Sequence, residues 1–358
     1  RLKRRLDEAR MTKLEIERNV ALAPLTSLEL GGPAKYFVRV RDEATLLQAL
    51  HWSADRETPF AILAGGSNLI VPDEGYEGLV VHMSIDSLDF HEGGTVTAGA
   101  GVAWEKVVDG AVARSWAGLE CLTGIPGSAG ATPIQNVGAY GAEVAEAITR
   151  VRVIRCDTLE PEELAPRDCG FGYRDSSFKR EPGRFIVSAV DFALRPNGPG
   201  AVRYAELASK IGPNATLAEI RRAVLELRRQ KSMLVEPGDP NRRSVGSFFL
   251  NPLVSSADAD RLVEQALADD LVSHSDEVPR HPVEGGAVKL AAGWLIEKAG
   301  VAKGSRRGAI GVSSKHALAL VHHGGGTTAE LLAFADEIQA RVLDRFGVTL
   351  EREPRLLA

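Results

Sequence analysis

Two glycine-rich segments of the sequence carry residue types that can hold an anion or a planar ligand. The first, GGSNL at residues 65–69, directly follows an apolar run at 60–63. Its consecutive glycines allow backbone N–H groups to converge on a phosphate, and the serine or asparagine side chain can add a donor. A plain tight turn explains this segment equally well, because short glycine runs are common in turns.

The second segment, IPGSAGATPIQNVGAYG at residues 125–141, combines glycines with amide side chains and contains no charged residue. A backbone this permissive can lie flat against a planar or diphosphate-bearing ligand. Ordered loops of this length tend to be functional. We therefore favour ligand binding over a purely structural loop here.

Three further residues could supply charge or protons. Arg174, in the bend FGYRDSS (171–177), could hold a carboxylate or stabilise developing negative charge. Lys231 continues an apolar helical stripe and could point its ammonium into a site. Ser247, between a glycine and two phenylalanines, could protonate a basic carbanion in a dry site. The structural alternatives are a surface turn, a lysine that meets its helix dipole, and a strand edge.

Other chemistries lack their motifs. Gly99-Ala100-Gly101 follows a predicted strand, but Trp104 stands where the third glycine of a Rossmann fingerprint belongs. The chain has no P-loop, no serine-hydrolase elbow and no HExxH motif. The pair His322-His323 precedes glycines without metal-ligand spacing, so no metal site is expected.

Composition narrows the class of protein. A net charge of −5 creates no global basic field for nucleic acid, and no apolar run approaches the ~18 residues of a membrane span. The three cysteines fit neither a redox pair nor a zinc knuckle, and an odd number argues against a secreted disulfide scaffold. The opening residues show no signal-peptide pattern. We expect a cytoplasmic protein that neither binds nucleic acid nor inserts into a membrane.

Periodicity predicts the elements that must position these residues. Strand, helix and strand are expected at 36–40, 43–54 and 60–63, followed by an apolar run at 79–81. Short strands are expected at 95–98, 151–154 and 185–194. Capping boxes predict helices after Thr216 and Thr327, the latter ending at Gly347. Further helices are expected at 258–268 and 289–299, and a terminal strand at 348–350.

Taken together, the segments resemble the UDP-N-acetylenolpyruvoylglucosamine reductase family, in its longer form. The resemblance runs in order from about Leu25 to Arg355. It is carried by the two glycine segments, by FGYRDSSFK at 171–179 and by GSFFLNP at 246–252. AVKLAAGWLIEKAG at 287–300 and the closing LEREPR add to it.

The resemblance implies an α+β fold: a two-part FAD-binding region of the PCMH-type flavoprotein fold and a smaller α+β substrate-binding domain. The implied segments are an N-terminal extension (1–19), FAD-binding subdomains 1 (20–84) and 2 (85–232), a substrate-binding domain (233–346) and a C-terminal strand and tail (347–358).

It also implies a reaction. NADPH reduces non-covalently bound FAD, whose N5 then delivers hydride to the enol-ether carbon distal to the carboxylate of a UDP-sugar enolpyruvate. Arg174 and Glu353 match the residues that stabilise the resulting carbanion or enolate, and Ser247 matches the proton donor. The implied FAD-binding residues are Gly65, Gly66, Ser67, Asn68, Leu69, Ile125, Pro126, Gly127, Gly130, Ala131, Asn136, Gly138, Ala139 and Tyr140. The implied substrate-binding residues are Tyr173, Tyr204, Lys231, Asn251, Lys289 and His316.

Three positions depart from the family pattern. Ala64 replaces a frequent glycine, and His281 stands where some members place a tyrosine of a substrate lid. Pro354 follows Glu353 where valine is usual, so Glu351 is an alternative acid. The spacing to Arg355 favours Glu353.

Two other functions compete with this one. Another FAD-dependent oxidoreductase or oxidase of the same architecture would lack a use for Ser247 and for a diphosphate site. A catalytically inactive nucleotide-binding regulator would have no reason to keep Arg174, Ser247 and Glu353 together.

Overall fold

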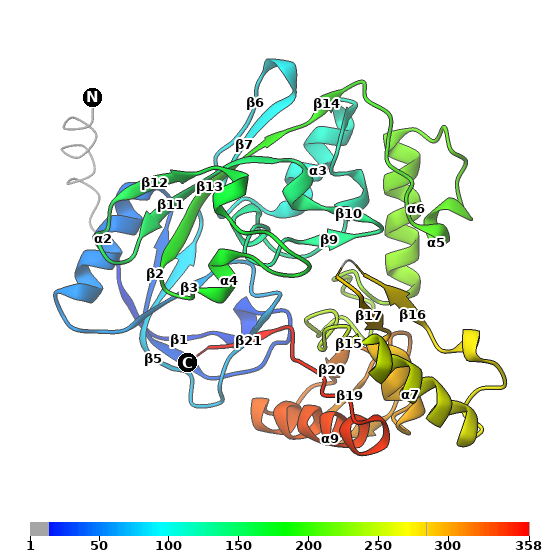
Figure 1. Ribbon diagram of the computed structural model, residues 1–358. Coiled ribbons are helices and arrows are strands. Elements are labelled where there is room, and N and C mark those ends of the chain that lie inside the picture. Colours follow the sequence, from blue (N-terminus) through cyan, green and yellow to red (C-terminus); the bar gives the residue numbers. More distant parts are fainter. Residues whose placement is uncertain (1–13, 284, 358) are drawn as a thin grey trace. The chain divides into compact units, whose positions relative to one another are not determined.

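The computed structural model describes residues 14–283 and 285–357 and divides into two compact units (Figure 1). Of the described chain, unit 1 comprises 14–20, 33–66 and 76–234, and unit 2 comprises 21–32, 67–75 and 235–357. The finer predicted division at residues 84, 232 and 346 stays a prediction. The predicted extension 1–19 falls largely outside the described residues.

The first sheet of unit 1 is built on parallel pairing. Among the described residues its order is β1-β2-β5-β3, and β2 and β3 both run parallel to β5. Helix α2 begins where the Asp42 side chain accepts from the amide of Thr45, as expected for an N-cap. The predicted strand, helix and strand are therefore confirmed. The bounds are β1 Glu17–Ala21, β2 Pro33–Val40, α2 Glu43–Ala54, β3 Phe60–Leu63 and β5 Tyr76–Met83.

The second sheet of unit 1 is antiparallel, in the order β12-β11-β13-β7-β6. Strand β13 lies inside it and is buried along nearly its whole length, which explains its near-continuous apolar sequence. Figure 1 shows β12, β11 and β13 side by side. The bounds are β6 Leu88–Phe90, β7 Thr95–Gly99, β11 Ile148–Arg155, β12 Pro161–Leu164 and β13 Phe185–Ala193.

Helices and two short strand pairs complete unit 1. Helix α6 begins with the predicted capping box, in which Thr216 and Glu219 satisfy each other's backbone amides. Trp104, the residue that breaks the Rossmann pattern, is fully buried at the start of α3 and donates from Nε1 to the Leu122 carbonyl. The bounds are α3 Trp104–Ala113, β8 Trp116–Ala117, β9 Gly138–Ala139, β10 Ala142–Glu143, α4 Ser177–Arg180, β14 Arg195–Pro196, α5 Ala205–Ala208 and α6 Leu217–Gln230.

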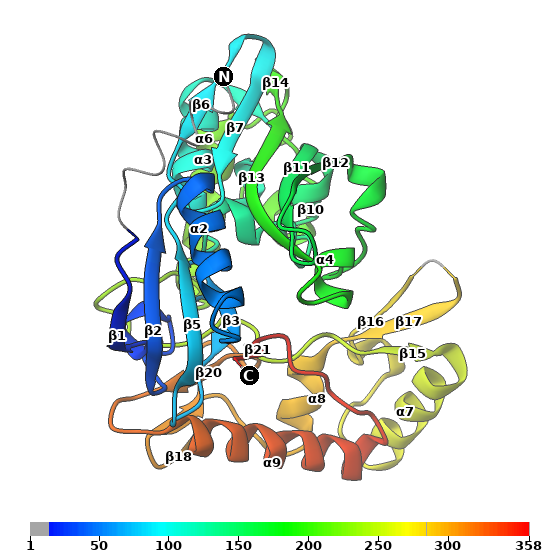
Figure 2. The same cartoon turned by 90° about the vertical axis from the view of Figure 1, so that its left-hand side faces the viewer.

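Unit 2 has its own hydrophobic core. Its described strands form two small antiparallel sheets, β15-β17-β16 and β18-β19-β20, and a parallel pair, β21-β4. Figure 2 shows the long helix α9 along one side of this unit, with α8 against it. The bounds are β4 Leu69–Ile70, β15 Leu253–Ser255, α7 Ser256–Ala268, β16 Arg280–Pro282, β17 Ala287–Leu290, α8 Ala292–Lys298, β18 Arg306–Arg307, β19 Ile310–Val312, β20 Leu320–His322, α9 Thr328–Phe346 and β21 Arg355–Leu356.

Two predicted elements of unit 2 are wrong in position. The predicted helix 289–299 starts only at Ala292, because Lys289 belongs to the central strand β17. The predicted strand 348–350 is absent. Val348 and Leu350 alternate because both side chains are buried in the core, and the strand of the tail is β21. The last long helix is confirmed, and Gly347 ends it with φ +65°, a conformation that favours glycine.

Among the described residues, no helix is long and apolar enough to cross a bilayer.

Candidate active site

The two predicted glycine segments touch each other within unit 1. A Cβ atom added to Gly65 would lie 2.7 Å from the Cα of Gly127, a separation that real Cβ atoms do not reach. A Cβ on Gly130 would lie 2.4 Å from that of Ala100. The backbones therefore approach so closely that neither position tolerates a side chain.

Ser128 is the residue of this contact that sequence reasoning missed. It is buried, at 4% exposure, and its Oγ has no hydrogen-bond partner among the described residues. The neighbouring amides of Ala129 and Gly130 already donate to the carbonyls of Val102 and Ala100. An unsatisfied buried hydroxyl is costly unless a ligand engages it. This turn thus fits a phosphate-bearing cofactor through the Ser128 hydroxyl.

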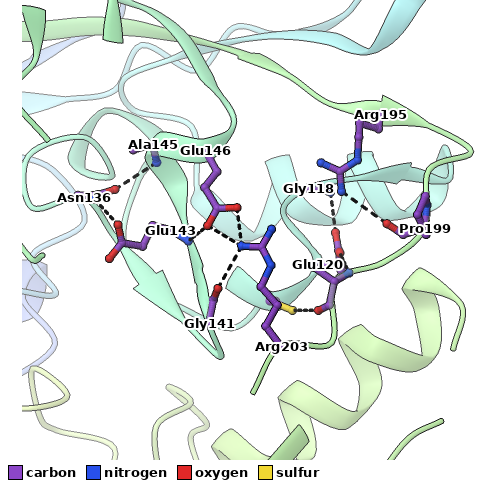
Figure 3. Close-up of polar contacts among 12 residues, drawn as sticks. Gly118, Glu120, Asn136, Gly141, Glu143, Ala145, Glu146, Arg195, Pro199 and Arg203 are labelled. Atoms are coloured by element: carbon purple, nitrogen blue, oxygen red, sulfur yellow. Dashed lines mark hydrogen bonds and ion pairs between the residues drawn. The ribbon is translucent and has the colours of Figure 1, made fainter. Parts of the chain in front are cut away.

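Asn136 ties the second glycine segment to the bend that carries Arg174. It is buried, and its Nδ2 donates to Glu143 Oε2 over 2.7 Å (Figure 3). The same nitrogen donates to the Gly172 carbonyl over 3.0 Å. Its Oδ1 accepts from the amide of Ala145 over 3.1 Å. The Asn136 side chain thus holds the loop in shape through contacts with the protein.

Arg174 lies beside the same loop. Its Nη2 donates to the carbonyl of Gly138, and Lys179 Nζ donates to the carbonyl of Arg174 over 2.8 Å. The Arg174 backbone has φ +52°, in the left-handed region that non-glycine residues seldom adopt. Its guanidinium carbon lies 5.9 Å from the ring centroid of Tyr173, which is 42% exposed. Predicted substrate-binding and FAD-binding residues therefore meet here.

Elsewhere in unit 1, Tyr204 contacts Tyr140, and Glu206, two residues further along the chain, contacts Lys231. The two tyrosine rings meet edge to face with centroids 5.6 Å apart. Burial raises the pKa of the Tyr140 hydroxyl to about 12, so this residue stays neutral at physiological pH. Lys231 caps the C-terminus of α6, and its Nζ donates to Glu206 Oε2 over 2.5 Å. The lysine side chain thus points toward α5.

In unit 2, backbone pairing between two distant segments places Glu353 beside the segment that carries Ser247. Around Phe248 and Phe249 the chain runs antiparallel to the tail: the Glu353 amide donates to the Phe248 carbonyl over 2.9 Å. Both phenylalanines are fully buried, so their side chains anchor the segment in the protein interior. Gly246 precedes Ser247 with φ +75° in the left-handed region.

The first glycine segment contributes its second half to unit 2, beside the same tail. The Arg355 amide donates to the Asn68 carbonyl over 3.1 Å, and Asn68 Nδ2 donates weakly to the Glu353 carbonyl over 3.5 Å. Strands β4 and β21 then pair Leu69 with Arg355. The structure therefore places Glu353 next to a predicted FAD-binding segment.

The other predicted substrate residues of unit 2 lie on three neighbouring segments. Asn251 Oδ1 accepts from the Ala292 amide over 3.0 Å at the start of α8. Lys289 lies on β17 opposite His281 of β16, so the departure at His281 faces a predicted substrate residue. His316 lies in the turn before β20. The Leu318 carbonyl of the same turn accepts from the amide of Phe248, the residue after Ser247.

The described residues contain no group of His, Cys, Asp or Glu that could hold a metal ion. The donors at this site, namely close-packed glycines, a buried unsatisfied hydroxyl and cationic side chains, suit a nucleotide cofactor and an anionic substrate instead.

Comparisons with known proteins agree with this chemistry. The profile of FAD binding domains matches residues 34–158, and that of the UDP-N-acetylenolpyruvoylglucosamine reductase C-terminal domain matches 239–357. Together they define an FAD-dependent oxidoreductase with an α+β fold, so the predicted fold class and cofactor are confirmed.

The relatives specify the family. UDP-N-acetylenolpyruvoylglucosamine reductases from Thermobifida fusca and Salinispora arenicola are 41% and 44% identical, covering 95% and 94% of this chain and 97% and 94% of their own. The crystal structure of the reductase from Thermus caldophilus aligns with a TM-score of 0.66 at 26% identity, covering 97% of this chain and 100% of the other. This chain belongs to the UDP-N-acetylenolpyruvoylglucosamine reductase family, as its motifs predicted.

Proposed function

We propose that this chain reduces UDP-N-acetylglucosamine enolpyruvate to UDP-N-acetylmuramate with NADPH, in the synthesis of peptidoglycan precursors. Family membership supports the reaction. Its main structural support is the backbone pairing that holds Glu353 beside the segment of Ser247, because a reductase of this kind needs a proton donor and a charge-stabilising acid in fixed positions. FAD, held by the two glycine segments, would supply the redox chemistry by taking hydride from NADPH and giving it to the enolpyruvyl double bond.

Each catalytic residue has one proposed role. Hydride adds to the carbon distal to the carboxylate. The electron pair of the double bond then moves onto the carbon that bears the carboxylate. Arg174 neutralises the negative charge that spreads into the carboxylate, and Glu353 holds the enolate oxygen through a shared proton. Ser247 Oγ–H then protonates the carbon, and water returns a proton to the serine.

The binding residues are proposed in two sets. The two glycine segments, with Ser128, hold FAD without a covalent bond, since neither segment carries a histidine or cysteine. Tyr173, Tyr204, Lys231, Asn251, Lys289 and His316 bind the substrate. We further propose a cytoplasmic location, where both NADPH and UDP-sugars are made, and no nucleic-acid partner.

An anaerobic titration of the purified yellow protein tests this function. NADPH should bleach the visible flavin absorbance, and stoichiometric UDP-N-acetylglucosamine enolpyruvate should restore it. Acid precipitation should leave the yellow colour in the supernatant. Absorbance restored by oxygen but not by the enolpyruvyl nucleotide would instead favour an oxidase of the same architecture.

A further inference from the structure

Lys231 is held by a carboxylate of its own unit. Its Nζ lies 2.5 Å from Glu206 Oε2, at the start of α5. The two side chains are 33% and 37% exposed, so a ligand can reach both. A lysine proposed to bind the substrate diphosphate therefore already holds an anion.

The segment that leads to Glu206 is anchored by a buried carboxylate. Glu120 is 1% exposed, and one of its oxygens accepts from the amide of Gly118 over 2.7 Å (Figure 3). Its other oxygen accepts from the amide of Ala201 over 2.9 Å. The Cys121 thiol donates to the Ala201 carbonyl over 3.1 Å. Such charge-assisted bonds in a buried position fix the backbone at residue 201.

The same segment is fixed again two residues later. Arg203 Nη1 donates to both oxygens of Glu146, over 2.9 and 2.8 Å, and to the Gly141 carbonyl over 3.4 Å (Figure 3). Tyr204 then packs against Tyr140. Glu206 therefore follows a stretch tied to the second glycine segment, and its carboxylate is presented to Lys231 by a fixed backbone.

We propose that Glu206 is an internal competitor that occupies Lys231 until a diphosphate displaces it. The proposal rests on the assignment of Lys231 to the substrate diphosphate. A ligand must break the Lys231–Glu206 pair and approach an uncompensated carboxylate. Breaking the pair and leaving the Glu206 carboxylate beside the ligand both oppose the binding of a phosphate group at Lys231. Glu206 thus lowers the affinity of this site for phosphate-bearing ligands.

A double-mutant cycle on the FAD-loaded protein tests this inference, with UDP as the probe in calorimetric titrations. Glu206→Gln should tighten UDP binding by about two- to fivefold, the range for a partly exposed ion pair. Lys231→Ala should weaken UDP binding. In the Lys231→Ala background, Glu206→Gln should have little further effect, because the competition requires the lysine.

The outcomes separate the two claims. Unchanged UDP affinity in Lys231→Ala would remove the lysine from the proposed diphosphate site. Weaker binding in Lys231→Ala, combined with unchanged or weaker binding in Glu206→Gln, would overturn the competitor role and make Glu206 a group that holds Lys231 in place. Glu206→Ala should repeat the Glu206→Gln result. The control is Glu226→Gln, which breaks the exposed Arg229–Glu226 pair on α6 and should leave UDP affinity unchanged.

Discussion

The backbone amide of Glu353 donates to the carbonyl of Phe248 over 2.9 Å, so the proposed acid is tied directly to the residue that follows the proposed proton donor, Ser247. A second hydrogen bond joins the same two segments: the Leu250 amide donates to the Glu351 carbonyl over 2.9 Å. The position of Glu353 therefore depends on the same buried segment as that of Ser247.

Glu353 and Glu351 give a matched pair of substitutions. Glu351 is exposed, whereas Glu353, two residues further along the chain, is half-buried. Glu353→Gln should lower kcat for the overall reaction by ~10²–10⁴-fold, the range for a lost general acid or base, while Glu351→Gln should change kcat by less than about threefold. Steady-state assays of both variants decide between them, and the reverse pattern would make Glu351 the acid.

Ser128→Ala should affect cofactor binding without weakening the fold. The hydroxyl has no partner among the described residues, so its removal should leave the thermal stability of the FAD-free protein unchanged or slightly raised. FAD affinity should fall by about ten- to a hundredfold, because one hydrogen bond to a charged group is typically worth ~1.5–3 kcal/mol. Quenching of FAD fluorescence measures the affinity. A lower melting temperature with unchanged FAD affinity would mean that Ser128 serves the fold alone.

Asp191 should make the stability of the protein decrease at acidic pH. Burial would raise its pKa, but hydrogen bonds from Thr97 and Arg150 and the charge of Arg152 together hold it below the ordinary 3.8. A carboxyl group whose pKa is lowered on folding stabilises the protein above the unfolded pKa and loses this effect as pH falls through the folded one.

Asp191→Asn should therefore cost about 2–3 kcal/mol at pH 7, less than a fully buried pair because both arginines are partly exposed. The difference from the wild type should shrink below pH 3.8. Urea unfolding at pH 7 and pH 3 measures it, and a cost that does not depend on pH would contradict the ionic role.

Local patterns in the sequence predicted the local elements well. Helices α2, α6 and α9 were recognisable because their caps and apolar stripes are short-range signals. The strand expected at 348–350 failed because alternation reports burial, and burial at Val348 and Leu350 comes from core packing without strand pairing.

The site could be predicted only in part. Motifs indicated Arg174, Ser247 and Glu353, but their neighbours depend on contacts between residues far apart in the chain. The unsatisfied hydroxyl of Ser128 and the pairing of Glu206 with Lys231 leave no periodic signal, because each depends on which segments the fold brings together.

The most direct test of the account is Ser247→Ala, followed by stopped-flow spectroscopy of each half-reaction. Bleaching of the flavin absorbance by NADPH needs no proton for a substrate carbanion, so its rate should stay within about twofold of the wild type. Return of the absorbance with the enolpyruvyl substrate should slow by ~10²–10⁴-fold, which is about 3–5 kcal/mol of barrier. A wild-type rate in this second half would remove Ser247 from the mechanism, and equal slowing of both halves would show a damaged fold in place of a lost proton donor.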